Sequence, residues 1–193
     1  MADTIHDDKK AFFDNITPLA AEEYEALQSI LGYKELKKKE YFLRQGQVCR
    51  HLALIVKGYV RLFYLVDGEE ITKDFNFENW ICGSYASFSM QQPSRFNIIA
   101  MEDCELYLIG RDDLYRLFDT YPNIQKLGRI QIERMFIYKE LREASFLLDS
   151  AEKRYHNLLE QQPHIVQRVP LKYLASYLGI SAETISRIRA GKR

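Results

Sequence analysis

Apolar residues recur at helical spacing near the C-terminal end of the chain, up to a glycine. The apolar positions are Leu171, Leu174, Ala175 and Leu178. Spacings of three and four residues place these side chains on one face of a helix. Gly179 then permits the positive φ angle that ends a helix and turns the chain. The pattern predicts a short helix that stops at this glycine.

A second short helix is predicted directly after the turn. Ser181 is a suitable N-cap, and the Glu183 carboxylate suits the positive end of a helix. Ile185 and Ile188 supply the buried face, while Ile180 fills the corner between the helices. Two short amphipathic helices joined by a glycine turn have the layout of a helix-turn-helix, so this segment is predicted to bind DNA.

The second helix carries its polar side chains on the face opposite the isoleucines. Glu183 and Arg187 are four residues apart and project together. The carboxylate can accept a hydrogen bond from cytosine N4, and the guanidinium can bind guanine O6 and N7. The residues expected to contact phosphates or to flank the bases are Ser181, Thr184, Ser186, Arg189 and Lys192. The alternative is an ion pair on a solvated helix, worth roughly 0.2–0.5 kcal/mol, that contacts no base.

Between residues 35 and 110 the chain breaks into short β-rich runs separated by glycines. Val60, Leu62, Tyr64 and Val66 alternate with a period of two, and Asp67-Gly68 is a two-residue hairpin signal. The predicted strands span residues 52–56, 59–66, 70–77, 96–100 and 106–109. Several short strands of this kind favour a sandwich or a barrel.

Helical spacing flanks the β-rich region. Thr17-Pro18 predicts the start of a helix that ends at Gly32. After the strands, residues 112–121 predict a short helix, and Pro122 begins a long helix that reaches about Leu148. Asp149-Ser150 is the expected break before a helix that runs through residue 159. The units expected are residues 1–121, 122–149 and 150–193.

The long helix is apolar on two sides. One stripe repeats in steps of three and four: Leu127, Ile130, Arg134, Ile137, Leu141, Ala144 and Leu148. Four apolar residues lie off that stripe: Ile132, Met135, Phe136 and Phe146. Such a helix has two partners, here the β-rich unit and a parallel copy of itself in a homodimer. The alternative is burial of the helix inside a monomeric core.

Charge is divided unevenly along a chain with no net charge. Residues 1–121 contain 14 Lys and Arg against 20 Asp and Glu, whereas residues 122–193 contain 13 against 7. The C-terminal part is therefore the part expected to bind a polyanion. No leader and no apolar run near twenty residues is found, which predicts a cytoplasmic protein without a membrane partner.

The residue types that carry catalysis are scattered. Cys49, Cys82 and Cys104 have no metal-type spacing and fit a reduced compartment. The four histidines are also scattered, and no phosphate loop or nucleophile elbow is present. We therefore expect no enzyme.

The order of these elements resembles the Crp/Fnr family of bacterial transcription regulators over nearly the whole chain. The matching stretches are Phe42-Leu-Arg-Gln-Gly46, residues 52–62, Cys104-Glu-Leu106, Leu148-Asp149 and residues 181–187. The short length and the C-terminal ending look most like the branch abundant in Bacteroidetes. The resemblance implies an α+β fold: an N-terminal double-stranded, jelly-roll-like β-roll with flanking helices, a long dimerisation helix and a C-terminal helix-turn-helix domain.

The resemblance places Glu183 and Arg187 on the two principal base-reading positions of the family. The additional family arginine is Ala182 here, so the preferred sequence is expected to differ. The implied partners are double-stranded DNA with a near-palindromic site, a second copy of the chain and RNA polymerase. The runner-up function is a small-molecule sensor or cupin-like module whose helical tail binds a protein.

The small-molecule contacts of the family are poorly matched. Its Gly-Glu-Leu turn reads Gly83-Ser84-Tyr85, and its Arg-Ser/Thr-Ala segment aligns within about a residue with Ser94-Arg95-Phe96. Cyclic AMP would lose a ribose acceptor and a bidentate phosphate contact, each worth on the order of 1.5–3 kcal/mol. We expect weak binding of cyclic AMP or none. Another effector remains an alternative, with Arg95 as a source of positive charge and Arg134 and Tyr138 as contacts from the long helix. The opposing readings are a solvated loop arginine for Arg95 and an intersubunit ion pair to Glu133 or Glu140 for Arg134. The candidate effector pocket therefore consists of Gly83, Ser84, Tyr85, Ser94, Arg95, Phe96, Arg134 and Tyr138.

Overall fold

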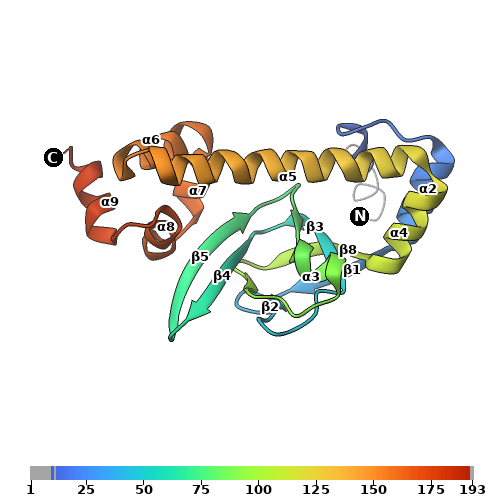
Figure 1. Ribbon diagram of the computed structural model, residues 1–193, viewed down its shortest axis with the longest axis horizontal. Helices are drawn as coiled ribbons and strands as arrows, with labels where there is room; N and C mark the ends of the chain where they lie inside the picture. Colours follow the sequence, from blue (N-terminus) through green and yellow to red (C-terminus); the bar gives the residue numbers. More distant parts are fainter. Residues whose placement is uncertain (1–9, 11, 192–193) are drawn as a thin grey trace.

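The long helix α5, Pro122–Leu148, runs along the long axis of the protein, with a β-roll against its middle and further helices at both ends (Figure 1). The structure is a computed structural model that describes residue 10 and residues 12–191. The α+β class with an antiparallel β-roll is confirmed.

The roll consists of two four-stranded sheets in which every pair of neighbours is antiparallel. One sheet has the order β1 (Leu31–Leu36), β8 (Cys104–Gly110), β3 (His51–Lys57), β6 (Ile81–Cys82). The other has the order β2 (Tyr41–Leu43), β7 (Asn97–Ala100), β4 (Val60–Val66), β5 (Glu69–Asn76). Val60 and Leu62 of one sheet and Ile55 and Leu106 of the other lie in one buried core.

The predicted hairpin between β4 and β5 is confirmed. Val66 pairs with Glu69, so Asp67 and Gly68 form a two-residue loop. Both loop residues have positive φ angles, 51° and 85°. These angles match the turn type that continues the twist of the two strands.

The predicted end of the first helix is wrong. Helix α2 spans Ala21–Ser29, and Leu31 and Gly32 belong to β1, where they pair with Ile109 and Leu108. Helical spacing could not reveal this change, because the partner strand lies far along the sequence. Pairing in the sheet, and not local helix propensity, determines the conformation of these residues.

Four further elements are shorter than the sequence patterns can resolve. They are β2, β6, helix α3 (Tyr85–Met90) and helix α7 (Pro163–Arg168). Pro163 occupies the first turn of α7, directly after the preceding helix ends at Gln161. Proline is well tolerated there, since its missing N–H would have no partner in the helix.

Helices α4 (Arg111–Thr120) and α5 confirm the two helices predicted after the strands. Gly128 faces the ring of Phe118, and a Cβ atom at Gly128 would lie 2.5 Å from the ring Cζ. The glycine therefore allows the close contact between α4 and α5. Along the second half of α5, Phe136, Ile137 and Leu141 are exposed.

The C-terminal unit, residues 150–191, contains α6 (Ala151–Gln161), α7, α8 (Leu171–Leu178) and α9 (Ala182–Arg189). The core of this unit includes buried side chains from the outer face of the roll. Tyr59, Phe75 and Phe77 of the roll form one cluster with buried side chains of the C-terminal unit, among them Leu174 and Ile185. The roll therefore supplies part of the apolar surface against which these helices pack.

Candidate nucleic-acid interface

The turn between α8 and α9 has the geometry that the sequence predicts. Gly179 has φ 67° and ψ 36°. The amide of Ile180 donates to the carbonyl of Ala175 at 3.0 Å, and that of Gly179 donates to Ser176 at 3.2 Å. This pair of bonds is a Schellman motif, which satisfies the last carbonyls of α8 and directs the chain into the next helix.

Helix α9 begins at the predicted cap. The Oγ of Ser181 accepts a hydrogen bond from the Thr184 amide at 3.2 Å. Ile185 is fully buried, and Ala182 and Ile188 pack at the edge of the same cluster. The buried face of α9 therefore holds the helix in place and leaves its opposite face exposed.

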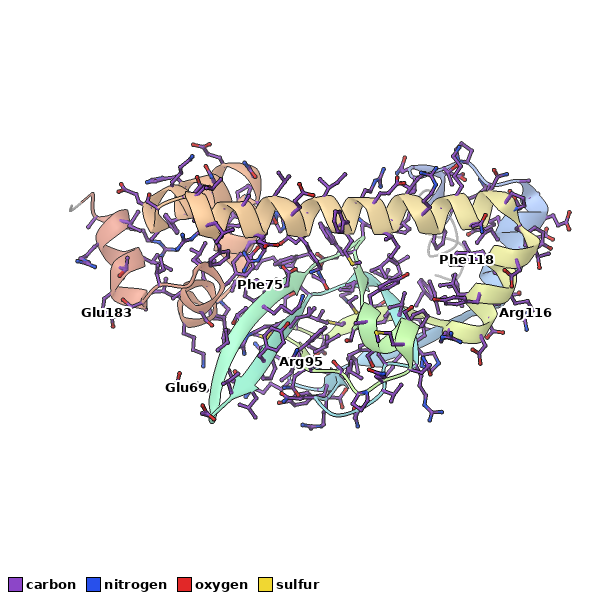
Figure 2. All side chains as sticks on the ribbon, viewed as in Figure 1. Glu69, Phe75, Arg95, Arg116, Phe118 and Glu183 are labelled. Atoms are coloured by element: carbon purple, nitrogen blue, oxygen red, sulfur yellow. The ribbon has the colours of Figure 1, made fainter. Side chains whose placement is uncertain are left out.

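That opposite face presents Glu183, Ser186 and Arg187 to solvent. Figure 2 shows Glu183 at one extremity of the protein, opposite Arg116 at the other. The Nη2 of Arg187 donates to the Oγ1 of Thr184 at 3.3 Å. Among the described residues, no ion pair joins Arg187 to Glu183. Both charged groups are therefore available to a partner.

Glu183 is held in its charged form. Hydrogen bonds from its own backbone amide and from the Ser181 hydroxyl lower the pKa of the Glu183 carboxyl. An ionised carboxylate only accepts hydrogen bonds. It can therefore accept from an amino group at a base edge, and it repels phosphates.

The residues expected to contact phosphates are differently engaged. The Nε of Arg189 donates to the hydroxyl of Tyr155 on α6 at 2.8 Å, and Ser186 donates to the carbonyl of Ala182 at 3.1 Å. Ser181 and Thr184 lie 3.2 Å apart, oxygen to oxygen. Lys192 lies outside the described residues.

Arg154 is a structural residue of this interface that the sequence analysis missed. Its Nη2 donates to the carbonyl of Leu178 at 3.1 Å, and its Nη1 donates to the carbonyl of Asp149 at 2.8 Å. It thus joins the end of α8 to the segment after α5. The periodicity of α6 carries no signal for these contacts, because both partners lie outside that helix.

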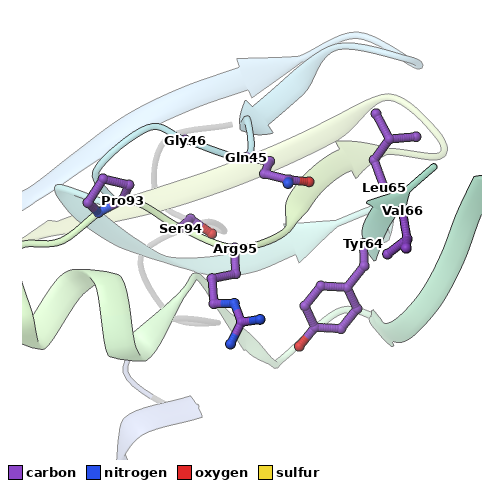
Figure 3. Close-up of a pocket in the computed structure, with 8 residues that line it drawn as sticks. All are labelled: Gln45, Gly46, Tyr64, Leu65, Val66, Pro93, Ser94 and Arg95. Atoms are coloured by element: carbon purple, nitrogen blue, oxygen red, sulfur yellow. The ribbon is translucent and has the colours of Figure 1, made fainter. Parts of the chain in front are cut away.

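A hollow of ≈ 330 Å³ lies on the roll beside the β4–β5 hairpin. Its lining residues are Gln45, Gly46, Tyr64, Leu65, Val66, Pro93, Ser94 and Arg95. Figure 3 shows the side chains of Arg95 and Tyr64 extending to the same side of the hollow. Its volume is at the lower end of the range of about 300–1,000 Å³ found for small-molecule sites.

Of the eight effector residues predicted, Ser94 and Arg95 line this hollow. Phe96 packs edge-on against Tyr64, with ring centroids 5.8 Å apart. The others lie elsewhere. Gly83 and Ser84 precede α3, Tyr85 begins it, and Arg134 is exposed on α5. The hydroxyl of Tyr138 bonds to Asp74 and Tyr177.

Comparison with known proteins identifies the roll. Residues 33–121 match the cyclic nucleotide-binding domain family. The match ends where α5 is about to begin, so it covers the roll and α4. No curated protein matches the chain by sequence.

Solved structures extend the likeness to the helices around this domain. The catabolite activator protein of Thermus thermophilus is 22% identical, with a TM-score of 0.59, over 91% of this chain and 84% of the other. A protein from Eubacterium rectale assigned to the Crp/Fnr family is 21% identical, with a TM-score of 0.68, over 92% and 87%. FixK2 from Bradyrhizobium japonicum is 17% identical, with a TM-score of 0.72, over 84% of each chain. The resemblance to Crp/Fnr regulators is thus confirmed for the domain and the fold, while the Bacteroidetes branch stays a prediction.

None of the described helices combines the length and apolar character that a membrane crossing requires. Within the same residues, no group of three or more His, Cys, Asp or Glu side chains is arranged to hold a metal ion. The free cysteines Cys49, Cys82 and Cys104 are all buried, and burial raises the pKa of each thiol.

Proposed function

We propose that the protein is a sequence-specific DNA-binding transcription regulator that acts as a homodimer. Helices α8 and α9 serve as the helix-turn-helix, and α9 is the recognition helix. The observation that carries this proposal is the exposed face of α9, where Glu183 and Arg187 stand side by side without pairing with each other. A carboxylate and a guanidinium one helical turn apart suit a cytosine and a guanine at the floor of the major groove.

The division of charge supports the same assignment. Residues 1–121 carry a net charge of −6, and residues 122–193 carry +6. An excess of basic residues attracts the phosphate backbone and makes affinity depend on salt. The acidic roll, in contrast, is kept away from DNA by its own charge.

The homodimer is supported by apolar side chains that one chain leaves uncovered. On α5, Ile137 is 56% exposed, Leu141 66% and Leu148 82%. They belong to the stripe predicted to pair with a parallel copy, so burial inside one chain does not account for them. Exposed contiguous apolar surface is typical of an interface. A parallel pair would place both α9 helices at the same end of the dimer, since α9 lies beyond the end of α5 (Figure 1).

The decisive experiment is selection of DNA from a randomised pool by the purified protein. We expect a near-palindromic sequence, because helix-turn-helix dimers read half-sites about 34–36 Å apart. Affinity for that sequence should fall steeply as salt rises, owing to the release of counterions from several phosphates. Failure to enrich any sequence would contradict the proposal and favour the alternative, a sensor module whose helical tail binds a protein.

The hollow beside Arg95 and Ser94 is the candidate site for a small-molecule effector. The family carboxylate that binds the ribose is missing after Gly83, and no arginine stands at the family's phosphate-binding position. Cyclic AMP is therefore expected to bind weakly or not at all. Calorimetry with cyclic AMP tests this point. A dissociation constant in the low micromolar range would contradict it. RNA polymerase as a partner and a cytoplasmic location follow from the proposed role.

A further inference from the structure

A polar junction joins the roll, the long helix and the helix pair at one point. It consists of Asp74 on β5, Tyr138 on α5, and Ser176 and Tyr177 on α8. The hydroxyl of Tyr138 donates to the Oδ1 of Asp74 at 3.0 Å and lies 2.9 Å from the hydroxyl of Tyr177. Since the one proton of Tyr138 is directed at Asp74, Tyr177 must donate to Tyr138. The bonds form a chain from α8 through α5 to β5.

The second part of the junction is a direct bond between the roll and α8. The backbone amide of Thr72 on β5 donates to the Oγ of Ser176 at 2.8 Å. Beside it, the guanidinium of Arg61 on β4 stacks on the ring of Tyr173, 3.9 Å from its centroid. Arg61 is itself fixed by Thr72 and Glu70, at 2.9 and 2.6 Å. The roll therefore presents a preformed surface to α8.

Aromatic rings pack against the junction, whose centre is buried, while Tyr138 and Ser176 are part-buried. Asp74 and Tyr177 are each 4% exposed. Trp80 packs edge-on against Tyr138, and Phe75 packs against Tyr177, with centroids 5.5 and 5.3 Å apart. The Nη2 of Arg142, one turn beyond Tyr138 on α5, donates to the carbonyl of Tyr177 at 2.9 Å. Hydrogen bonds in such a setting are directional and costly to leave unmade, so they specify one orientation of α8.

We propose that Tyr138, Ser176 and Tyr177 are positioning residues for DNA binding, which fix the angle between the roll and the helix pair and thereby the direction of α9. This inference rests on the proposed function. The docked arrangement leaves Glu183 and Arg187 exposed, so it is the arrangement competent to bind DNA. In a dimer, a fixed angle at each junction sets the distance between the two recognition helices.

The test uses three conservative variants of the full-length protein: Tyr177→Phe, Ser176→Ala and the double variant. Tyr177→Phe keeps the ring contacts and leaves the bond between Tyr138 and Asp74 intact. The buried Asp74 carboxylate therefore keeps Tyr138 as its hydrogen-bond donor. Tyr33→Phe is the control, because Tyr33 is an exposed tyrosine on β1, outside the junction, whose hydroxyl bonds to Glu35 at 3.2 Å.

The first measurement needs no DNA. Hydrogen exchange of the Thr72 amide reports directly on its bond to Ser176, and exchange within α8 reports on docking. We expect exchange in these segments to rise about tenfold in the double variant, because each lost bond contributes about a factor of two to ten. Exchange in β3 and β8 should stay unchanged. Unaltered exchange at Thr72 and in α8 would overturn the junction as the element that holds the helix pair.

The second measurement separates positioning from stability. DNA fragments carrying the selected half-sites at a series of spacings are titrated with each variant. We expect the wild-type protein and Tyr33→Phe to prefer one spacing sharply. The double variant should lose about tenfold in affinity at that spacing and bind the neighbouring spacings almost equally well, since two hydrogen bonds no longer fix α9. A uniform loss at every spacing, or a gain in affinity, would overturn the positioning role.

The two measurements also separate this inference from the proposed function. If the wild-type protein selects no DNA, the proposed function fails, and the role of the junction in DNA binding fails with it. The exchange experiment would still decide whether the junction holds the helix pair on the roll. If the wild-type protein selects DNA and the variants keep its spacing preference, the proposed function stands and only the junction is refuted.

Discussion

The guanidinium of Arg187 is directed back along α9 to Thr184, with Nη2 and Oγ1 3.3 Å apart, instead of pairing with Glu183 four residues away. This bond leaves the remaining donors of the guanidinium on the exposed face. The carboxylate of Glu183 accepts hydrogen bonds from its own amide and from Ser181, and a carboxylate has acceptor sites for further donors. The two base-reading candidates therefore need not break an ion pair before they contact DNA.

The Arg187→Ala variant should lose about 1–3 kcal/mol of discrimination at one base pair of each selected half-site, because a bidentate contact to guanine is lost. Competition titrations with operators mutated at single positions measure this. Arg116→Ala is a suitable control, since Arg116 is an exposed arginine at the opposite end of the protein, paired with Asp113 at 2.7 Å. Equal discrimination by the wild-type protein and Arg187→Ala would refute the base-reading assignment.

The Ser181→Ala variant should destabilise the C-terminal unit by about 0.5–2 kcal/mol, through loss of the N-cap bond to Thr184. Ser186→Ala in the same helix is a matched control. Its hydroxyl bonds to the Ala182 carbonyl within the helix, so its removal should change the free energy of unfolding little. Urea denaturation followed by circular dichroism measures both. Equal losses in the two variants would show that the cap is not what stabilises the start of α9.

Acid should loosen the contact between the roll and α7. Arg168 on α7 binds Glu78 through two bonds, at 2.8 and 2.9 Å. Burial alone would raise the pKa of Glu78, but hydrogen bonds from Arg168 and from backbone amides outweigh it and lower the pKa. The contribution of Glu78 to stability is therefore complete above its unfolded pKa, and it is lost as the pH falls through the lower folded value.

Glu78→Gln should consequently flatten the decline in melting temperature below about pH 4.5, the ordinary range of a glutamate pKa. Glu69→Gln at the tip of the hairpin serves as the control, because Glu69 is an exposed carboxylate beside the turn (Figure 2). A Glu78→Gln profile parallel to the wild-type profile over pH 3 to 6 would show that this ion pair does not contribute to the acid sensitivity.

The sequence predicts what depends on neighbouring residues. The cap at Ser181, the turn at Gly179, the hairpin at Asp67-Gly68 and the start of α5 at Pro122 all follow from local backbone chemistry, and all are found. The predicted end of α2 is wrong, because Leu31 belongs to a strand and pairs with Ile109, which lies far along the chain. Helical spacing carries no information about such a partner.

One part of the candidate site could likewise be predicted from the sequence, and another part could not. The exposed face of α9 could be predicted from helical periodicity, because exposure of a short amphipathic helix follows from its own pattern. The contacts of Tyr138 could not be predicted from helical periodicity. Its hydroxyl meets Asp74 and Tyr177, which are 64 and 39 residues away in sequence. Only the packing of α8 against β5 brings these three groups together, and that packing depends on Tyr59, Phe75 and Phe77 projecting from the outer face of the roll.

Leu141 lies in the exposed apolar stripe on the second half of α5. Leu141→Glu should convert the dimer into a monomer, because a carboxylate at the centre of a paired apolar seam would be buried without a partner. Ile71→Glu is the matched control, since Ile71 is also an apolar side chain that is about half exposed, on the hairpin of the roll. Sedimentation velocity measures the mass, and DNA titration measures the consequence. A monomer with one recognition helix should bind the full site at least tenfold more weakly than the dimer, since the second half-site no longer adds to affinity through effective concentration. A Leu141→Glu protein that remains a dimer would show that α5 is not the interface between subunits.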